Sequence, residues 1–437
     1  MAISTANFSN EKGQSLSPSS FKIKKLEITN HKGIVRDITN IVVSFSITES
    51  LYTPSLIANF KIKDVNNFFE DFPIIGQEKI NIVIEKKNVD NEATIDLDFI
   101  VTEYPLFGRA VAQHIQVYTL NCISPFAYIS NLKKISKSFD DLTSVTIQKI
   151  YENDLGEELI IDEKAISRAK GVIPTMNPLK ACGWLKSKTF DNKQSPYYLY
   201  QTLSGICQLT SHYTLTQSSV YESYVDGKDY NQEPQTSDEY RQRARRILEL
   251  ASDLKLGKMF QSMDGAFSSS NKLLDVANKT YLTELYTYKD IQENLGKSSL
   301  SSTFKVDGKT LDKINDSHLE HISINSQAYD GEFETLNDMR KTAKGKPKGY
   351  LENFETFNHD IKLFGDFKLN AGRKINLKFP KTCDPEVQKQ ILKENKNDYY
   401  DKHLSGDYII TSVVHIFEDG EHYSNVRVKR DSFSIDL

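Results

Sequence analysis

The chain has 437 residues, and its 55 basic and 59 acidic side chains give a formal net charge of −4. This near balance argues against a nucleic-acid binder, which usually carries a basic excess. The sequence has no run of about 18 apolar residues, so it predicts no membrane span. The length favours about two to four domains over a single one.

Neither the N-terminus nor the cysteines indicate a secreted or metal-binding protein. Residues 1–20 are polar and lack the apolar stretch of a signal peptide, so they predict a flexible arm. No two cysteines have the spacing of a metal or redox site. We therefore expect reduced, buried thiols in a protein that is assembled in the cytosol, without a cofactor or a metal ion. The cysteines are Cys122, Cys182, Cys207 and Cys383.

Residues 21–125 predict a first β-barrel. Apolar and polar residues alternate there in short runs separated by turn residues, a pattern typical of a barrel or a sandwich. In the first run the alternation slips once, at Lys25. The expected strands are Phe21–Ile28, Val42–Ile47, Leu56–Ile62, Lys79–Glu85, Ile95–Thr102 and Ile115–Leu120.

Residues 126–196 predict a small mixed α/β domain, because the spacing of apolar residues changes there. Phe126–Ile135 and Leu142–Tyr151 have helical patterns. A further helix is expected to begin at Asn177-Pro178, since asparagine caps helices and proline fits the first helical turn.

Residues 197–225 and 318–437 predict a second β-barrel, interrupted by a helix-containing insertion at 226–317. In the insertion, an apolar stripe at helical spacing predicts a helix over Asp238–Lys255, whereas residues 262–317 are only weakly patterned. Residues 381–404 are highly charged and predict a surface insertion. The expected strands are Tyr197–Tyr200, Tyr213–Tyr224, His321–Asn325, Asp360–Leu369, Lys374–Phe379, Tyr408–Phe417 and Tyr423–Lys429. The fold class is therefore mainly β with α+β insertions.

A weak internal repeat links the two predicted barrels. Gly76–Ile82 is similar to Gly372–Leu377. A strand follows each motif, Phe99–Thr102 in the first half and Tyr408–Thr411 in the second. Short strand motifs also recur by chance, and chance similarity is the alternative interpretation.

The spacing that follows the repeated motif supports a true duplication. Fifteen residues separate Thr102 from Val117, and 15 separate Thr411 from Val426. This predicts two similar β-barrels in one chain. Three copies would place six barrels in a closed ring, which could join a sixfold partner to a threefold one.

Several blocks of sequence share their pattern and order with a known family. They are Leu51–Ser55, Gly76–Ile80, Asn177–Ala181 with Trp184 and Leu185, Ser195–Gly205, Ser405–His415 and Val426–Asp431. In this order they resemble the central baseplate hub protein of T-even-type contractile-tailed phages, a family related to the N-terminal hub of VgrG and to late control D proteins. Residues 226–317 depart from the family pattern.

The resemblance implies a structural protein rather than an enzyme: a homotrimeric hub with quasi-sixfold symmetry in the tail baseplate of a virion. The implied partners are the tail tube or tube-initiator proteins, the central spike protein, the baseplate wedge proteins and the tape measure protein. DNA would pass through the lumen without specific binding, and a trimer's net charge of −12, three times −4, is compatible with this. Because no β-helical or lysozyme-like segment follows the last strand, the spike and any hydrolase are expected to be separate chains.

No pattern of residues predicts an active site. His318 and His321 could share one face of a helix and bind a metal ion, but surface or linker histidines are favoured. Glu157 and Glu158 could form a hydrolase pair, but a solvated surface is favoured. An arginine cluster is expected to be the solvated face of the predicted helix or, alternatively, to meet an acidic partner or DNA. Its members are Arg241, Arg243, Arg245 and Arg246.

Two other functions remain open. The chain could be a tail-associated cell-wall hydrolase, which would need an acid pair or a metal site. It could also be a β-rich receptor-binding or carbohydrate-binding tail module, although such adhesins often carry a repetitive trimeric stalk, and none is visible in the sequence. The structural hub is the leading prediction.

Overall fold

The computed structural model of the chain describes residues 18–431, apart from internal gaps. The gaps are residues 66–67, 88–91, 104–106, 111–114, 164, 228–236, 255–257, 276–278, 288–304, 311–318, 325–344, 385, 388–390 and 392–398. Residues 1–17 of the predicted arm and parts of the charged stretch 381–404 therefore lie outside the described residues.

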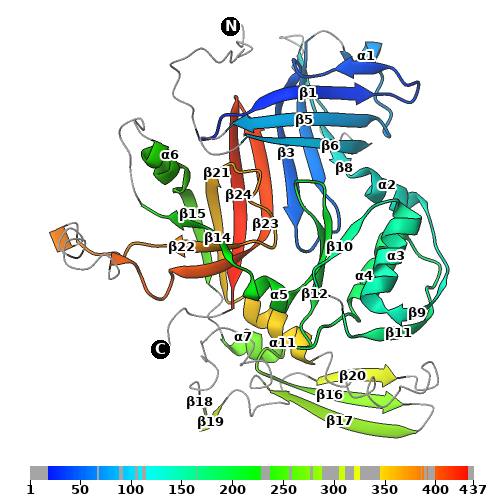
Figure 1. Ribbon diagram of the computed structural model, residues 1–437, viewed down its shortest axis with the longest axis vertical. Coiled ribbons are helices and arrows are strands. Elements are labelled where there is room, and N and C mark those ends of the chain that lie inside the picture. The colour runs from blue at the N-terminus through cyan, green and yellow to red at the C-terminus, as the bar shows by residue number, and fades with distance from the viewer. Residues whose placement is uncertain are drawn as a thin grey trace.

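The chain is mainly β, as predicted, and most of its strands join one 14-stranded sheet (Figure 1). The sheet has two halves, which we call the first unit and the second unit. The first unit contains β1 (Lys22–Thr29), β2 (Val35–Asp37), β3 (Val42–Ser50), β4 (Ile57–Asp64), α1 (Phe68–Asp71), β5 (Lys79–Lys87), β6 (Glu92–Glu103), β7 (Phe107–Ala110) and β8 (Ile115–Ile123). The second contains β14 (Val220–Val225), β15 (Ile247–Leu254), β21 (Phe357–Phe364), β22 (Lys374–Lys378), β23 (Gly406–Glu418) and β24 (Glu421–Arg430).

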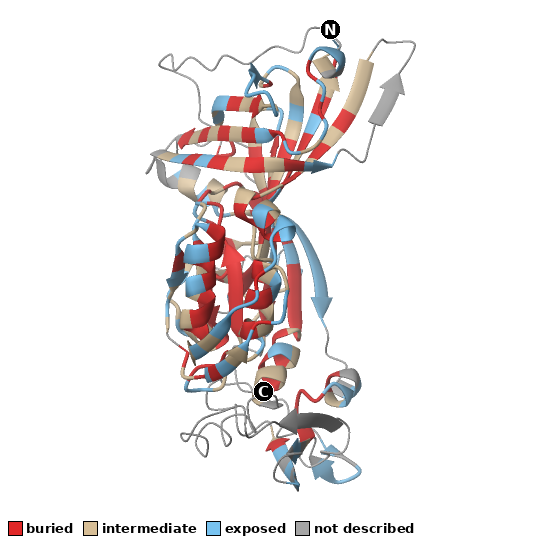
Figure 2. Ribbon diagram, turned by 90° about the vertical axis from the view of Figure 1, so that its right-hand side faces the viewer, coloured by how far each residue is buried: buried red, intermediate tan, exposed pale blue. Residues whose placement is uncertain are grey.

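Each unit encloses its own hydrophobic core. Buried residues alternate with more exposed ones along strands of the sheet (Figure 2). In β4 every second residue is buried. The alternation follows from the pleat, which points successive side chains to opposite faces. The first core includes Phe45, Phe60, Ile82, Phe99 and Leu120, and the second includes Phe357, Ile375, Tyr408, Val413 and Val426.

The two units have the same strand order, which confirms the repeat predicted from the sequence. In the first unit the order is β3-β4-β8-β6-β5-β1, and in the second it is β15-β21-β24-β23-β22-β14. The strands follow one another along the chain in the same sequence in both units. One difference is the last pair, since β1 runs antiparallel to β5 whereas β14 runs parallel to β22.

Equivalent side chains make equivalent contacts in the two units. The amide of Asn81 donates to Asp98 across β5 and β6 at 3.0 Å, and that of Asn376 donates to Asp407 across β22 and β23 at 2.7 Å. Matching side-chain contacts across matching strand pairs are hard to explain by chance. We therefore treat the two units as copies of one structural element.

A β-bulge also recurs at the same place in both units. Thr102 lies at a register shift and donates its hydroxyl to the Asn121 carbonyl, and Thr411 does the same with the Arg427 carbonyl. From threonine to carbonyl residue the distance is 19 residues in the first unit and 16 in the second. The prediction that equal spacings of 15 residues mark equivalent positions is therefore wrong, because the first hairpin is three residues longer.

Strand pairing among the described residues does not close either unit into a ring. In the first unit the Ile38 N–H donates to the Leu26 carbonyl at 3.0 Å, which extends the pairing of β1 with β2. In the second unit the Val225 N–H donates to the Arg245 carbonyl at 3.0 Å, so β14 contacts the residues just before β15. The prediction of two closed barrels is therefore not confirmed by the strand ladders.

A middle part, residues 124–217, connects the two units. It contains α2 (Pro125–Leu132), β9 (Ser138–Leu142), α3 (Thr143–Ile150), the π-helix η2 (Tyr151–Leu155), β10 (Leu159–Ile161), β11 (Arg168–Val172), α4 (Pro178–Lys186), β12 (Tyr197–Gln201), β13 (Cys207–Ser211) and α5 (His212–Gln217). The three predicted helices are confirmed, and α4 begins after Asn177 with Pro178 in its first turn. Strand β13 lies between β10 and β12 in a separate three-stranded sheet.

The predicted strand Tyr213–Tyr224 is wrong in its first half. Ser211 caps a short helix there, since its hydroxyl accepts a hydrogen bond from the Thr214 N–H. Side-chain capping of this kind satisfies a backbone donor that a helix start leaves open. The strand begins only at Val220.

The predicted helix Asp238–Lys255 is confirmed in its first part and wrong in its second. Helix α6 (Ser237–Ala244) ends early, and the following residues form β15, which pairs along its length with β21. Only Ile247 of β15 is buried. A helix formed by this segment would therefore have no hydrophobic core against which to pack its apolar face. Pairing with the edge of β21 satisfies the backbone instead.

The insertion between β15 and β21 is more ordered than its weak sequence pattern predicts. Its described elements form a small sheet, a two-stranded hairpin and two helices, at the bottom of Figure 1. They are α7 (Lys258–Met263), β16 (Ser268–Asp275), β17 (Thr280–Thr287), β18 (Lys305–Val306), β19 (Lys309–Thr310), β20 (Leu319–Ile324) and α11 (Gly345–Phe354).

Candidate functional site

The two units meet along β3 and β23, which run antiparallel at the centre of the sheet (Figure 1). The register extends from Ser50 opposite Ser412 to Ser44 opposite Glu418. We call this pairing and the polar side chains around it the inter-unit junction. It fixes the position of one unit relative to the other, so it is the site on which an assembly role would depend.

Glu49 is a fully buried carboxylate at the inter-unit junction. One oxygen accepts from the Leu203 N–H at 2.7 Å, and the other accepts from the Ala371 N–H at 2.8 Å. Leu203 belongs to the turn after β12, and Ala371 lies just before β22. A single side chain of the first unit thus binds backbone groups of the middle part and of the second unit.

Two buried histidines continue this polar cluster. His415 on β23 lies with Nε2 3.8 Å from Glu49, and its Nδ1 is 3.1 Å from Nε2 of His422 on β24. The Ser424 hydroxyl lies 3.2 Å from the same Nδ1, and the His422 ring stacks on Phe417 at 4.2 Å. Burial, with Lys86 and His415 nearby, holds the pKa of His422 well below its ordinary value, so this ring is neutral at neutral pH.

Lys86 on β5 completes the cluster. Its ammonium donates to the Gly365 carbonyl, and the side chain is almost fully buried. Gly365 in turn donates its N–H to the His422 carbonyl at 2.8 Å. A charge from the first unit therefore binds the end of β21 in the second, and the contact adds to the pairing of β3 with β23.

The buried ammonium of Lys86 predicts a pH dependence of stability. Burial lowers its pKa from 10.5 to about 8, against the opposing effect of the Asp366 and Glu421 carboxylates. Between these two pH values the unfolded chain holds a proton that the folded chain has released, so this group favours folding more as the pH rises. We expect the free energy of unfolding to rise, relative to that of Lys86→Met, by up to about 1.4 kcal/mol per pH unit.

Urea unfolding of both chains at several pH values in this window measures the difference. Buried thiols and tyrosines titrate in the same way in both chains, so their effects cancel. A difference that stays constant with pH would mean that Lys86 keeps its ordinary pKa.

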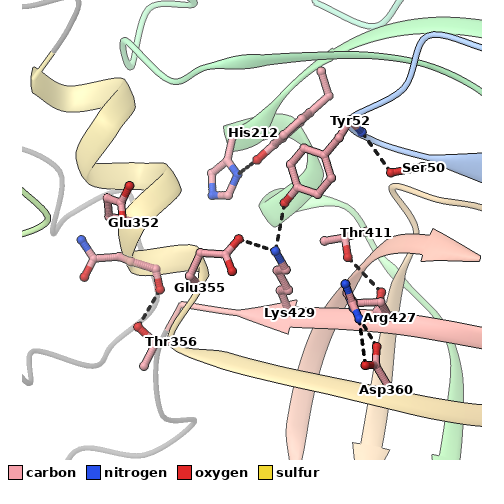
Figure 3. A network of polar contacts seen from close by, with 12 residues as sticks. Ser50, Tyr52, His212, Glu352, Glu355, Thr356, Asp360, Thr411, Arg427 and Lys429 are labelled. Carbon is pink, nitrogen blue, oxygen red and sulfur yellow. Dashed lines mark hydrogen bonds and ion pairs between the residues drawn. The ribbon is translucent and has the colours of Figure 1, made fainter. Parts of the chain in front are cut away.

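A second polar contact region joins the second unit to the first unit and to the insertion, beside the middle part (Figure 3). The Lys429 ammonium on β24 donates to the Glu355 carboxylate and, at 3.3 Å, to the Tyr52 hydroxyl. Beside it the Tyr198 hydroxyl is hydrogen bonded to His212 Nδ1 at 3.1 Å. Burial lowers the pKa of His212 to about 4, so this bond joins two neutral groups at neutral pH.

One serine and one histidine lie in contact like the nucleophile and base of a hydrolase, but the histidine is not suited to act as a base. Ser252 Oγ lies 2.8 Å from His359 Nδ1, and His359 Nε2 lies 3.1 Å from the Tyr408 hydroxyl. Burial, together with Arg430, lowers the pKa of His359 to about 4, so it is a weak base at neutral pH. A tyrosine also replaces the carboxylate that orients the base in a catalytic triad.

The residues considered for chemistry in the sequence do not come together as a site. His321 lies on strand β20, not on a helix, and His318 lies outside the described residues. Burial raises the pKa of Glu157, whereas Glu158 is exposed. In the part of the chain that the structure describes, no group of three or more His, Cys, Asp or Glu side chains could hold a metal ion.

The arginine cluster is split between two elements. Arg241 and Arg243 lie on α6, whereas Arg245 and Arg246 lie in the turn before β15. The Arg245 guanidinium is paired with Glu222 on β14 at 2.7 Å. The predicted single helical face is therefore wrong, and at least this arginine binds within the chain.

The remaining predictions about side chains and membrane helices have mixed outcomes. All four cysteines are free, and three are buried as expected, whereas Cys383 is half-buried. Among the described helices none is both long and apolar enough to cross a membrane.

The fold of the chain is similar to that of two tail proteins of known structure. The chain is similar to the tail protein of Neisseria meningitidis MC58, with a TM-score of 0.52 and 10% identity over 96% of this chain and all of that one. It is also similar to the 43 kDa tail protein of prophage MuSo2 from Shewanella oneidensis, with a TM-score of 0.53 and 11% identity over 93% and 98% of the two chains. No protein-family model and no curated protein matches the sequence. The resemblance to tail proteins is thus confirmed at the level of fold.

Proposed function

We propose that the chain is a structural hub of a contractile injection tail, in which three copies form a ring in the baseplate. The observation that carries this proposal is the duplication, since one chain holds two units with the same strand order and the same cross-strand contacts. The fold similarity to two phage tail proteins supports the same class of function.

The geometry of the inter-unit junction suits a ring. It is heterologous, because β3 of the first unit meets β23 of the second, and these strands are not counterparts. A repeated heterologous contact gives a closed ring or an open filament. We propose that six units from three chains close a ring of quasi-sixfold symmetry, in which each unit is a β-barrel.

In this proposal the ring joins the sixfold tail tube to the threefold central spike and forms part of the DNA conduit. The tube or tube-initiator proteins, the wedge proteins and the tape measure protein are the other proposed partners. The role is structural rather than enzymatic, and DNA passes without specific binding.

Light scattering on the purified chain tests the proposal. We expect a particle of three times 49.9 kDa, about 150 kDa, at micromolar concentration. A trimer of this kind requires an obligate interface, which typically buries on the order of 2,000–5,000 Å². A stable monomer under the same conditions would contradict the proposal.

A further inference from the structure

The inter-unit junction offers a template for the contact between neighbouring chains. Because each unit is a copy of the other, each has a counterpart of β3 and a counterpart of β23. Only one β3–β23 pairing can form within a chain, so the second unit's counterpart of β3 and the first unit's counterpart of β23 remain for contacts elsewhere. The sheet registers identify both.

The counterpart of β3 is β15. Strand β3 pairs with β4 so that Ile47 lies opposite Ala58, and β15 pairs with β21 so that Ser252 lies opposite His359. Ala58 pairs with a residue of β8, and His359 pairs with a residue of β24. These two partner residues are equivalent in the two units, so Ala58 and His359 are equivalent as well. By this register the counterpart of the buried Glu49 is Leu254.

The counterpart of β23 is β6 together with β7. Strand β23 pairs with β24 over most of its length, whereas in the first unit β8 pairs first with β6 and then with β7. The part of β23 that binds β3 thus corresponds to the end of β6 and to Phe107–Ala110 of β7. Among the described residues β8 is the only strand that pairs with β7.

The outer edge of β15 is open in the same way. Strand β15 is the terminal strand of the sheet, and in the described part of the chain it pairs only with β21. Leu250 and Leu254 on it are 39% and 37% exposed. A long edge strand is a template for pairing with another chain. The charged residues Glu249 and Asp253 and a register shift between Ile247 and Glu249 are also part of this strand.

Apolar residues lie where the polar contact of the junction would be repeated. In the junction Glu49 accepts from the N–H of Ala371, the residue before Gly372. Gly372 donates to the Ile410 carbonyl as Gln77 donates to the Val101 carbonyl, so the counterpart of Ala371 is Gly76. Ile75, beside Gly76, is 65% exposed.

We propose that β15 of one chain pairs antiparallel with the β6–β7 edge of a second copy, so that the contact between chains repeats the β3–β23 contact within a chain. Leu254 of one copy then lies beside Ile75 of the next, where the inner junction has Glu49. This inference rests on the proposed ring and names its interface.

Charge placed at Leu254 tests the interface. We expect Leu254→Arg to reduce the particle to one third of the native mass in light scattering, because an arginine would be buried without a partner. The matched control is Leu274→Arg, which alters a leucine of similar exposure, 45%, on β16 and should leave the mass unchanged. Thermal unfolding shows whether each variant is folded.

Cross-linking gives a second test that does not depend on the folding of the arginine variant. In a Cys383→Ser background, Ile75→Cys with Leu254→Cys should give covalent dimers and trimers with a short thiol-reactive cross-linker, and either cysteine alone should give only monomers. If the native chain is trimeric but Leu254→Arg stays trimeric and no cross-link forms, the interface is wrong and the hub proposal stands. If the native chain is monomeric, both proposals fail.

Discussion

Replacing Glu49 with alanine is expected to lower the free energy of unfolding by about 3–5 kcal/mol. The substitution leaves the buried N–H groups of Leu203 and Ala371 without acceptors, and each unsatisfied buried donor costs roughly 1–3 kcal/mol. It also opens space beside His415 in a part of the molecule that is fully buried. Urea unfolding followed by far-UV circular dichroism measures the change.

Two further variants separate the role of the carboxylate from a general effect of mutation. Glu49→Gln keeps one oxygen acceptor but turns an amide toward the second N–H, so we expect a smaller loss than for alanine. Glu158→Ala, at an exposed carboxylate, should change the free energy by less than about 0.5 kcal/mol. A loss below about 1 kcal/mol for Glu49→Ala would show that the junction does not depend on this side chain.

Replacing Gly365 with alanine is expected to cost about 3 kcal/mol, at the upper end for overpacking. A Cβ atom at this position would lie 2.2 Å from Cγ and Nδ1 of His422. The ring cannot move away freely, because it stacks on Phe417 and is hydrogen bonded to His415. The change therefore strains the junction itself.

The double variant Gly365→Ala with His422→Ala tests this explanation, since Gly365→Ala should cost less stability in the His422→Ala background than in the native chain. Gly183→Ala is the matched control, because it lies inside helix α4 and a Cβ atom added there would meet nothing within 4 Å beyond the backbone of its own helix. Alanine favours a helix there by up to about 1 kcal/mol. A Gly365→Ala chain as stable as the native one would place the His422 ring elsewhere.

Much of the fold could be predicted from local patterns. The slip of alternation at Lys25 corresponds to a register shift between Ile23 and Lys25, and Asn177-Pro178 begins α4. These features depend on neighbours in sequence, where side-chain period and capping act directly. The repeat was recognisable because Asn81 and Asn376 keep the same place on equivalent strands.

The errors arose where tertiary contacts override local preference. The apolar residues that predicted a helix through Leu254 have helical spacing, yet the segment pairs as a strand with the open edge of β21. Short strands such as β7 have too few residues for a period to be visible.

The junction could not be predicted, because its residues are far apart in the sequence. Glu49 is one of 59 acidic residues, and nothing in its neighbourhood distinguishes it from a solvated one. Its partners Leu203 and Ala371 use backbone groups, which have no signature in the sequence. The two histidines, His415 and His422, occur in a strand pair whose pattern indicated only alternation.

End-on images of the purified particle in the electron microscope test the central claim most directly. If three chains place six equivalent units in a ring, class averages will show six similar lobes around an open centre, with the middle parts and insertions marking every second lobe. A particle with only three lobes, or one without a closed ring, would contradict the account.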